Sequence, residues 1–299
     1  MMIDPPDLNY QVTHVTRYAY SEQVPVCHNL VHLAPRELPY QRCAKYQPTV
    51  NPEPLSITER DDYCGNRVEY FSIHDPHAAM TVSANSHLVL SPRPVVEPRK
   101  SPPWESVVQQ VAEDCSYSGL DARQYLFASP YTRLERRFAD YARESFGVGR
   151  PVWEAALELT ARLHKDFRYD PRSTTVHSSL DEVMAQRSGV CQDFAHLQIA
   201  CLRSLGLPAR YVSGYLRTLA PPGKPRLIGV DASHAWLSLY GGPQCGWVDF
   251  DPTNNQIPGT DYLTVAWGRD YADVCPIQGV VIGGGLHTMS VSVNVELLP

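Results

Sequence analysis

The chain has 299 residues, of which 43 % are hydrophobic and 19 % charged, as is typical of a folded protein with one large or two ordinary domains. Its formal net charge is −6, and no cluster of lysine and arginine forms a basic patch, which argues against nucleic acid or an anionic membrane as a partner. No apolar run reaches the roughly 18 to 20 residues that a membrane-spanning helix needs.

The first part of the chain has the pattern of β-strands. The segment "MMIDPPDLNY" has an early aspartate and two prolines where a signal peptide would have a basic start and an apolar run, so we predict a cytoplasmic location. Alternation predicts strands in "YQVTHVTRYAY", from Val68 to Ile73 and in "AAMTVSANSHLVL". Prolines at 92, 94, 98, 102 and 103 then indicate a boundary, which divides the chain into a β-rich domain over 1–98 and a second part over 99–299.

Helical periodicity replaces alternation in the second part. Helices are predicted in "PPWESVVQQVAEDC", in "YTRLERRFADYARESFG" and in "PVWEAALELTARLHKDF". The segment after Cys191 carries apolar residues on nearly every side, which predicts a buried central helix that ends at Gly206 and Pro208. The strands "ARYVSGYL", "SHAWLSLY" and "GWVDFDPT" follow, so the second part is predicted to be of the α+β class.

Cys191 differs from the other seven cysteines in its position. The eight cysteines are scattered without a CxxC pair, and seven of them are interpreted as reduced, small apolar side chains. Cys191 is expected on the first turn of the central helix, where unpaired backbone amides favour the thiolate and can hold an oxyanion. Ser188 is the predicted N-cap, and Gly189 permits close approach of a ligand to the backbone. A buried structural thiol is the alternative.

A predicted hairpin brings His234 close to an aspartate. If the connection runs from Gly241 to Gly246, Tyr240 pairs with Trp247, and Asp251 becomes the diagonal neighbour of His234 on the same face. Asp249 lies two residues further along the strand and is the reserve candidate. A cysteine nucleophile, a histidine base and an orienting aspartate form a triad for acyl transfer, whereas a satisfied histidine on a half-buried strand is the structural alternative.

Several motifs in order resemble one known family. The segments "GVCQDFAHL", "LGLPARYVSGYL", "SHAWLSLY", "GWVDFDPTNN" and "GRDYADVCPIQG" are similar to the transglutaminase-like superfamily in its bacterial branch. The segments "YQVTHVTRYAYSEQVP" and "HLAPRE" resemble the β-rich domain that precedes the core in this branch. The resemblance implies a papain-like core, a helix carrying the cysteine packed on an antiparallel sheet. It also implies Cys191 as nucleophile, His234 as base and Asp251 as third member, and it implies an oxyanion donor in "FRYDPRSTTVHSSL", where Tyr169 matches the family's aromatic residue.

The remaining polar and aromatic candidates are given supporting roles. Asp193 is expected to provide favourable charge at the helix start, with a substrate contact as the alternative. Trp236 and Trp247 either shield the triad or belong to the core, and His196 is expected to be structural. A zinc site built from Cys191, His234 and Asp251 is disfavoured because no paired Cys or His spacing supports it, so no metal and no cofactor is expected.

A triad of this kind forms a thioester and passes the acyl group to an acceptor. Water as acceptor gives a peptidase or amidase, and an amine gives a transglutaminase. We expect hydrolysis of a peptide or protein substrate, with amine transfer as the alternative. A peptide-binding module with a silent triad is the hypothesis from another class, and the intact Cys191, His234 and Asp251 argue against it. The sequence does not indicate an oligomeric state.

Overall fold

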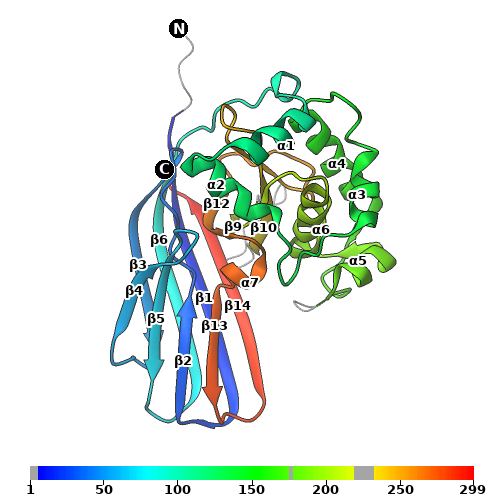
Figure 1. Cartoon of the computed structure of the whole chain (residues 1–299). Coiled ribbons are helices and arrows are strands. Elements are labelled where there is room, and N and C mark those ends of the chain that lie inside the picture. The colour runs from blue at the N-terminus through cyan, green and yellow to red at the C-terminus, as the bar shows by residue number, and fades with distance from the viewer. Residues whose placement is uncertain (1–5, 175–177, 219–231) are drawn as a thin grey trace, which may run out of the picture.

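The computed structural model describes residues 6–174, 178–218 and 232–299, and it places a long β-sandwich beside a helical lobe that surrounds a third sheet (Figure 1). The predicted α+β class is confirmed. Residues 1–5 of the predicted first domain and residues 175–177 of the segment predicted to supply an oxyanion donor lie outside the described residues. Among the helices of the described residues, none is both long and apolar enough to cross a membrane.

The sandwich consists of two antiparallel four-stranded sheets. The first sheet has the strand order β14 (His287–Leu297), β1 (Leu8–Val24), β6 (His77–Leu90) and β3 (Gln41–Asn51). The second has the order β13 (Ile277–Ile282), β2 (Val26–Val31), β5 (Arg67–Ile73) and β4 (Ile57–Asp61). Alternate residues of β1 and β6 are buried, so one face of the first sheet is packed and the other faces solvent.

The packed face of the first sheet covers two different neighbours. Tyr10 and Val12 of β1, with Val293 and Val295 of β14, belong to the core of the helical lobe. Val82 of β6 belongs instead to the core that the sandwich sheets share. The same sheet therefore joins the two parts of the molecule into one body.

The C-terminal strands return to the sandwich. Sequence division at residue 98 assigns them to the second part, but β14 pairs with β1 from Tyr10↔Leu297 to Tyr20↔His287, and β13 pairs with β2. The physical reason is that both strands complete sheets whose β1 and β2 edges would otherwise be unpaired. No local pattern in the sequence reveals a pairing between segments so far apart.

The helical lobe is built around the third sheet, of strand order β11 (Trp247–Phe250), β10 (Ala232–Tyr240), β9 (Ala209–Leu216) and β12 (Tyr262–Gly268). The short strands β7 (Arg168–Tyr169) and β8 (Ser188–Gly189) pair in parallel. The helices are α1 (Trp104–Glu113), α2 (Tyr117–Arg123), α3 (Arg136–Arg143), α4 (Val152–Asp166), α5 (Leu180–Gln186), α6 (Cys191–Ser204) and α7 (Tyr271–Val274), with 3-10 turns η1 (Pro98–Lys100) and η2 (Gln124–Leu126).

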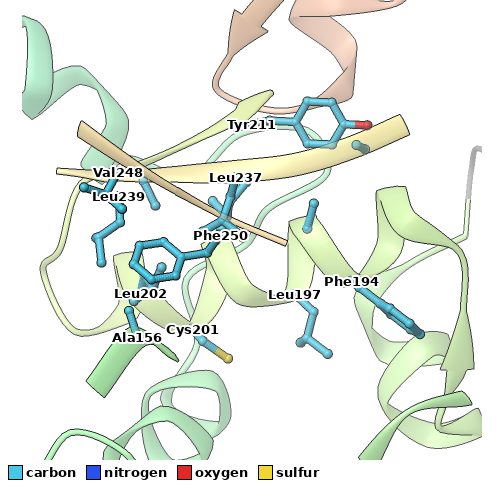
Figure 2. Packing of buried hydrophobic residues seen from close by; sticks show 14 of the residues in the cluster. Ala156, Phe194, Leu197, Cys201, Leu202, Tyr211, Leu237, Leu239, Val248 and Phe250 are labelled. Carbon is cyan, nitrogen blue, oxygen red and sulfur yellow. The ribbon is translucent and has the colours of Figure 1, made fainter. Parts of the chain in front are cut away.

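Helix α6 is the centre of this lobe, as its all-round apolar pattern predicts. Every residue from Gln192 to Arg203 is buried, and Figure 2 shows Leu202 of α6 near Ala156 of α4 and Phe250 of the third sheet. Truncating one such buried leucine to alanine costs about 2 to 5 kcal/mol of stability. The helix ends where Gly206 adopts a φ of +84°, a conformation that favours glycine. This packing fixes the position of the residue at the helix start.

Candidate active site

Cys191 is the first residue of α6, as predicted, but the helix is capped differently from the prediction. The N-cap residue is Val190, and Ser188 lies in β8 instead. The buried carboxylate of Asp193 accepts a hydrogen bond from the amide of Val190 at 2.8 Å and another from the hydroxyl of Thr174 at 2.6 Å. Asp193 therefore orders the turn that carries Cys191, which agrees with the favourable-charge interpretation. Burial raises the pKa of Asp193, and these hydrogen bonds oppose the increase.

Gly189 has a structural use in addition to the predicted close approach of a ligand, which stays a prediction. A Cβ atom at this position would lie 2.8 Å from the carboxylate oxygen of Asp193 and 2.9 Å from its Cβ. The glycine therefore makes room for the capping side chain of α6, and this explains it without a ligand.

His234 lies on β10 beside the start of α6 and is buried. Its Nε2 is 2.7 Å from Oδ2 of Asp251, so Nδ1 is the ring nitrogen left for Cys191, which lines the same cavity. Burial lowers the pKa of His234, but the hydrogen bonds to Asp251 and Cys191 and the charges of both groups outweigh it and raise the pKa to about 10. The arrangement favours an imidazolium beside the carboxylate of Asp251.

Asp251 is completely buried and its oxygens are fully engaged. Besides His234, Oδ2 accepts hydrogen bonds from the Tyr262 hydroxyl at 2.6 Å and the Asn254 side chain at 2.7 Å, and Oδ1 accepts the Thr253 amide at 2.8 Å. Burial would raise the pKa of this carboxyl. The hydrogen bond and charge of His234, together with the hydrogen bonds from Tyr262 and Asn254, outweigh burial and lower the pKa. The carboxylate is thereby held in one orientation toward the imidazole.

The predicted hairpin register is confirmed. Tyr240 pairs with Trp247 and Leu237 with Phe250, and Asp251 follows directly as the neighbour of His234. The reserve candidate Asp249 points elsewhere. Its carboxylate forms an ion pair with Arg93 at 2.6 Å and accepts the indole N–H of Trp236 at 3.1 Å. Asp249 thus ties the proline-rich segment after the sandwich to the third sheet.

Trp236 and Tyr169 lie close to the Cys191–His234 pair in different ways. The Trp236 ring is fully buried and stacks beside the imidazole of His234, with centroids 6.1 Å apart. Tyr169 pairs with Gly189 through β7 and β8 and is half exposed. Burial raises the pKa of the Tyr169 hydroxyl, and the charge of Cys191 adds to the increase. The predicted proximity of Tyr169 to Cys191 is therefore present, whereas its role as oxyanion donor stays a prediction.

Two further residues of the site, Tyr262 and Asn254, were missed by the sequence reasoning. Tyr262 and Asn254 bind the carboxylate of Asp251, and Asn254 Nδ2 is also 3.4 Å from Nε2 of His234. Tyr211, on β9 in the motif "LGLPARYVSGYL", is buried and lines the same cavity as Cys191. Asn254 stands three residues after Asp251 in "DPTNN", which is a usable signal, but no local pattern marks Tyr262.

Side chains suited to a metal are not gathered elsewhere. Within residues 6–174, 178–218 and 232–299, no group of three or more His, Cys, Asp and Glu side chains is arranged to hold a metal ion.

Comparison with known proteins identifies the family. Residues 10–89 match the bacterial transglutaminase-like N-terminal region, and residues 139–252 match the transglutaminase-like superfamily. The chain belongs to the transglutaminase-like superfamily. An uncharacterised protein of Mycobacterium tuberculosis is 39 % identical over 97 % of this chain and 92 % of its own length. This transglutaminase-like chain is also 32 % identical to a protein-glutamine gamma-glutamyltransferase of Pseudomonas aeruginosa, over 41 % of this chain and 18 % of that protein.

A solved structure shares the whole fold of this transglutaminase-like chain. It comes from Cytophaga hutchinsonii and is provisionally named a cysteine protease. The superposition has a TM-score of 0.77 at 22 % identity and covers 99 % of this chain and 93 % of that one. The likeness extends to both the sandwich and the helical lobe, which confirms the predicted papain-like or transglutaminase-like core with its N-terminal β-rich domain.

Cys191 and His234 of the transglutaminase-like core open into one cavity of about 460 Å³. The start of α6, β9 and β10 form one side of it, and strands of the sandwich form the opposite side. Figure 1 shows β1 and β14 running past the helical lobe at this place. A substrate in the cavity would therefore contact both parts of the molecule.

Proposed function

We propose that this transglutaminase-like protein is a cysteine-dependent enzyme that cleaves peptide or amide bonds through a thioester. The observation that carries the proposal is the meeting of Cys191 at the start of α6 and His234, whose imidazole binds the buried carboxylate of Asp251, at the wall of one open cavity. A structural cysteine needs no charged partner, and a peptide-binding module needs no aligned relay. The supporting shell of Tyr262 and Asn254 favours chemistry over mere binding.

The proposed reaction has two halves. The thiolate of Cys191 attacks the carbonyl carbon, and the backbone amides of the first turn of α6 stabilise the developing oxyanion. Collapse breaks the carbon–nitrogen bond while the imidazolium of His234 gives its proton to the leaving amine, which leaves a thioester on Cys191. A water molecule then attacks the thioester as His234 takes its proton, and the carboxylic acid product leaves with the thiolate–imidazolium pair restored.

The decisive test of an activated thiol is iodoacetamide labelling at pH 6, followed by mass analysis of each cysteine. We expect Cys191 to be alkylated faster than the other seven cysteines and expect His234→Ala to remove the advantage, because the imidazolium that stabilises the thiolate is lost. His74→Ala, at an exposed histidine of the sandwich, is the matched control and should label like the parent. Labelling of Cys191 no faster than the rest would favour the silent binding module.

Amine transfer is the second candidate, and the similarity to the Pseudomonas aeruginosa gamma-glutamyltransferase favours it. The same thioester serves both reactions, so the acceptor decides. Incubating the protein with glutamine-containing peptides, with and without cadaverine, separates the two. Free acid alone in both reactions supports hydrolysis, whereas an amide of cadaverine that depends on Cys191 supports transfer.

A further inference from the structure

The wall of the cavity opposite Cys191 is formed by the first sheet of the sandwich. Three pairs of residues across β1 and β14 line it. The pairs are His14 with Val293, Thr16 with Val291, and Tyr18 with Met289. Within each pair one residue comes from the start of the chain and the other from its end. We call these six residues the sheet wall.

The hydrogen-bond pattern shows which kind of cross-strand pair makes up the sheet wall. The amide of Ser21 donates to the carbonyl of Leu286, and the amide of Leu298 donates to the carbonyl of Asn9. These two bonds lie at opposite ends of the β1–β14 ladder and involve the even-numbered residues Leu286 and Leu298 that flank β14. The three pairs of the sheet wall are therefore the non-hydrogen-bonded kind, in which facing side chains approach most closely. All six of these residues line the same cavity.

Among the described residues, neither the sheet wall nor the rest of the cavity offers a substrate an acidic or basic side chain free to pair with it. None of the described residues that line the cavity is Lys, Arg, Asp or Glu. His14 is buried between the hydroxyls of Thr16, 3.0 Å from Nε2, and Tyr215, 3.1 Å from Nδ1, and burial lowers its pKa to about 4, so it is neutral near pH 7. The imidazole of His234 is engaged by Asp251 and Cys191. A charged substrate group would lose its hydration here without a new ion pair.

Two side chains of the sheet wall are left partly uncovered at the cavity. Met289 is 58 % exposed and Val291 is 48 % exposed, although both face the same space as Cys191. Apolar side chains left open beside a polar centre are typical of a surface that a ligand covers. Covering them with an apolar group would remove their surface from water, which stabilises the complex.

We propose that the sheet wall is a binding subsite for an uncharged, apolar side chain of the polypeptide whose carbonyl is attacked by Cys191. Tyr18, Met289 and Val291 make the contacts, and the subsite selects aliphatic or aromatic residues over acidic and basic ones. This subsite rests on the proposed function, because the bound chain is the acyl donor of that reaction. The specificity of the enzyme then comes from the sandwich, and the helical lobe supplies the chemistry.

The test uses dipeptidyl acyloxymethyl ketones, which alkylate an active-site thiol and carry side chains that can be varied. Each of the two residues is set in turn to Leu, Phe, Lys or Glu, and the second-order rate of Cys191 labelling is measured by intact mass. We expect Leu and Phe to react about tenfold or more faster than Lys and Glu at one of the two positions, a range usual for hydrophobic pockets.

Substitution of Val291, a residue of the sheet wall, by lysine or by glutamate provides the specific control. Val291→Lys should raise the rate of the Glu probe relative to the Leu probe by about tenfold, and Val291→Glu should do the same for the Lys probe. Val281→Lys and Val281→Glu are the matched controls, because Val281 is an exposed valine on β13, 39 % exposed and outside the cavity lining. The same change of preference in both sets of variants would overturn the subsite.

Iodoacetamide separates the two levels of the proposal, because it carries no side chain to bind. If Cys191 reacts selectively with iodoacetamide but all peptide probes react equally, the subsite is overturned and the proposed function stands. If Cys191 reacts no faster than the other cysteines, the proposed function fails and the subsite fails with it. Selective iodoacetamide labelling together with the apolar preference and its reversal at residue 291 supports both.

Discussion

The hydroxyl of Tyr262 donates a hydrogen bond to Oδ2 of Asp251 at 2.6 Å, and Nε2 of His234 lies 2.7 Å from the same oxygen. The Tyr262 hydroxyl in turn accepts a hydrogen bond from the side chain of Gln256 at 2.6 Å. The carboxylate is therefore oriented from the far side by a residue of β12, the strand at the opposite edge of the third sheet from β11. The imidazole is held in line by a network that spans the whole sheet.

Removing the Tyr262 hydroxyl should weaken the relay while Cys191, His234 and Asp251 all remain in place. We expect Tyr262→Phe to slow acylation of Cys191 by about tenfold, because a hydrogen bond to a charged group is worth about 1.5 to 3 kcal/mol and only part of it bears on orientation. Inactivation by the best peptide ketone, followed under pseudo-first-order conditions, measures the effect. Tyr240→Phe changes a hydroxyl outside this network and should leave the rate unaltered. A parental rate in Tyr262→Phe would mean that the hydroxyl does not orient Asp251.

Substitution of Asp251 should change mainly the reaction rate, whereas substitution of Asp249 should change mainly the stability of the fold. Asp251→Asn is expected to lower the acylation rate by about two to four orders of magnitude, because an amide cannot stabilise the imidazolium. Asp249→Asn should leave that rate near the parental value but lower the free energy of unfolding by about 2 to 4 kcal/mol, because Arg93 loses its partner in a mostly buried site. Kinetics and urea unfolding of both variants check this. The reverse pattern would make Asp249 the catalytic carboxylate.

The sequence predicted the hairpin and its carboxylate because those contacts are local. Strand alternation and a short turn together fix which side chains of "SHAWLSLY" and "GWVDFDPT" share a face, and one register then selects Asp251 over Asp249. The helix start at Cys191 was predictable for the same reason. The residue that caps this helix was not predictable. Ser188 and Asp193 can both accept a hydrogen bond from the first turn, and only the placement of Ser188 in β8 leaves that role to Asp193.

The parts of the site that the sequence did not reveal depend on distant contacts. Tyr262 reaches Asp251 only because β12 pairs with β9 on the side away from β10. The sheet wall needs β14 to pair with β1, which joins residues as far apart as Tyr10 and Leu297. Alternation in either strand shows that one face is apolar, but it does not say which partner that face meets. Pairing over such separations is a property of the whole fold.

The pKa of His234 should depend on Asp251 in a measurable way. Burial lowers this pKa, and the hydrogen bonds and charges of Asp251 and Cys191 raise it to about 10. We therefore expect His234 in the parent protein to keep its ring proton through neutral pH, and Asp251→Asn to lower the pKa, since the amide removes the negative charge beside the ring. NMR titration of protein containing ¹⁵N-labelled histidine follows the ring directly and needs no activity. An unchanged titration in Asp251→Asn would contradict the proposed electrostatic role.

Two buried histidines should make the protein sensitive to acid. Burial lowers the pKa of His196 from 6.5 to about 3 and that of His14 from 6.5 to about 4. The unfolded chain therefore binds these protons as the pH falls below 6.5 while the folded chain does not, so the free energy of unfolding decreases in that range. Each such proton contributes a slope of about 1.4 kcal/mol per pH unit. Urea unfolding between pH 6.5 and pH 5 measures the slope before most carboxylates titrate.

His196→Gln tests the contribution of one of these groups. The ring of His196 is stacked on Tyr131 and accepts the amide of Tyr271 at 3.1 Å, and a glutamine oxygen can accept the same amide. The variant is expected to be less stable at pH 7, because the ring contacts are lost, but its stability should fall less steeply toward pH 5, by about one proton's slope. His74→Gln, at an exposed position, controls for the loss of a histidine as such. If His196→Gln kept the parental slope, the proton taken up on acid unfolding would belong to another residue.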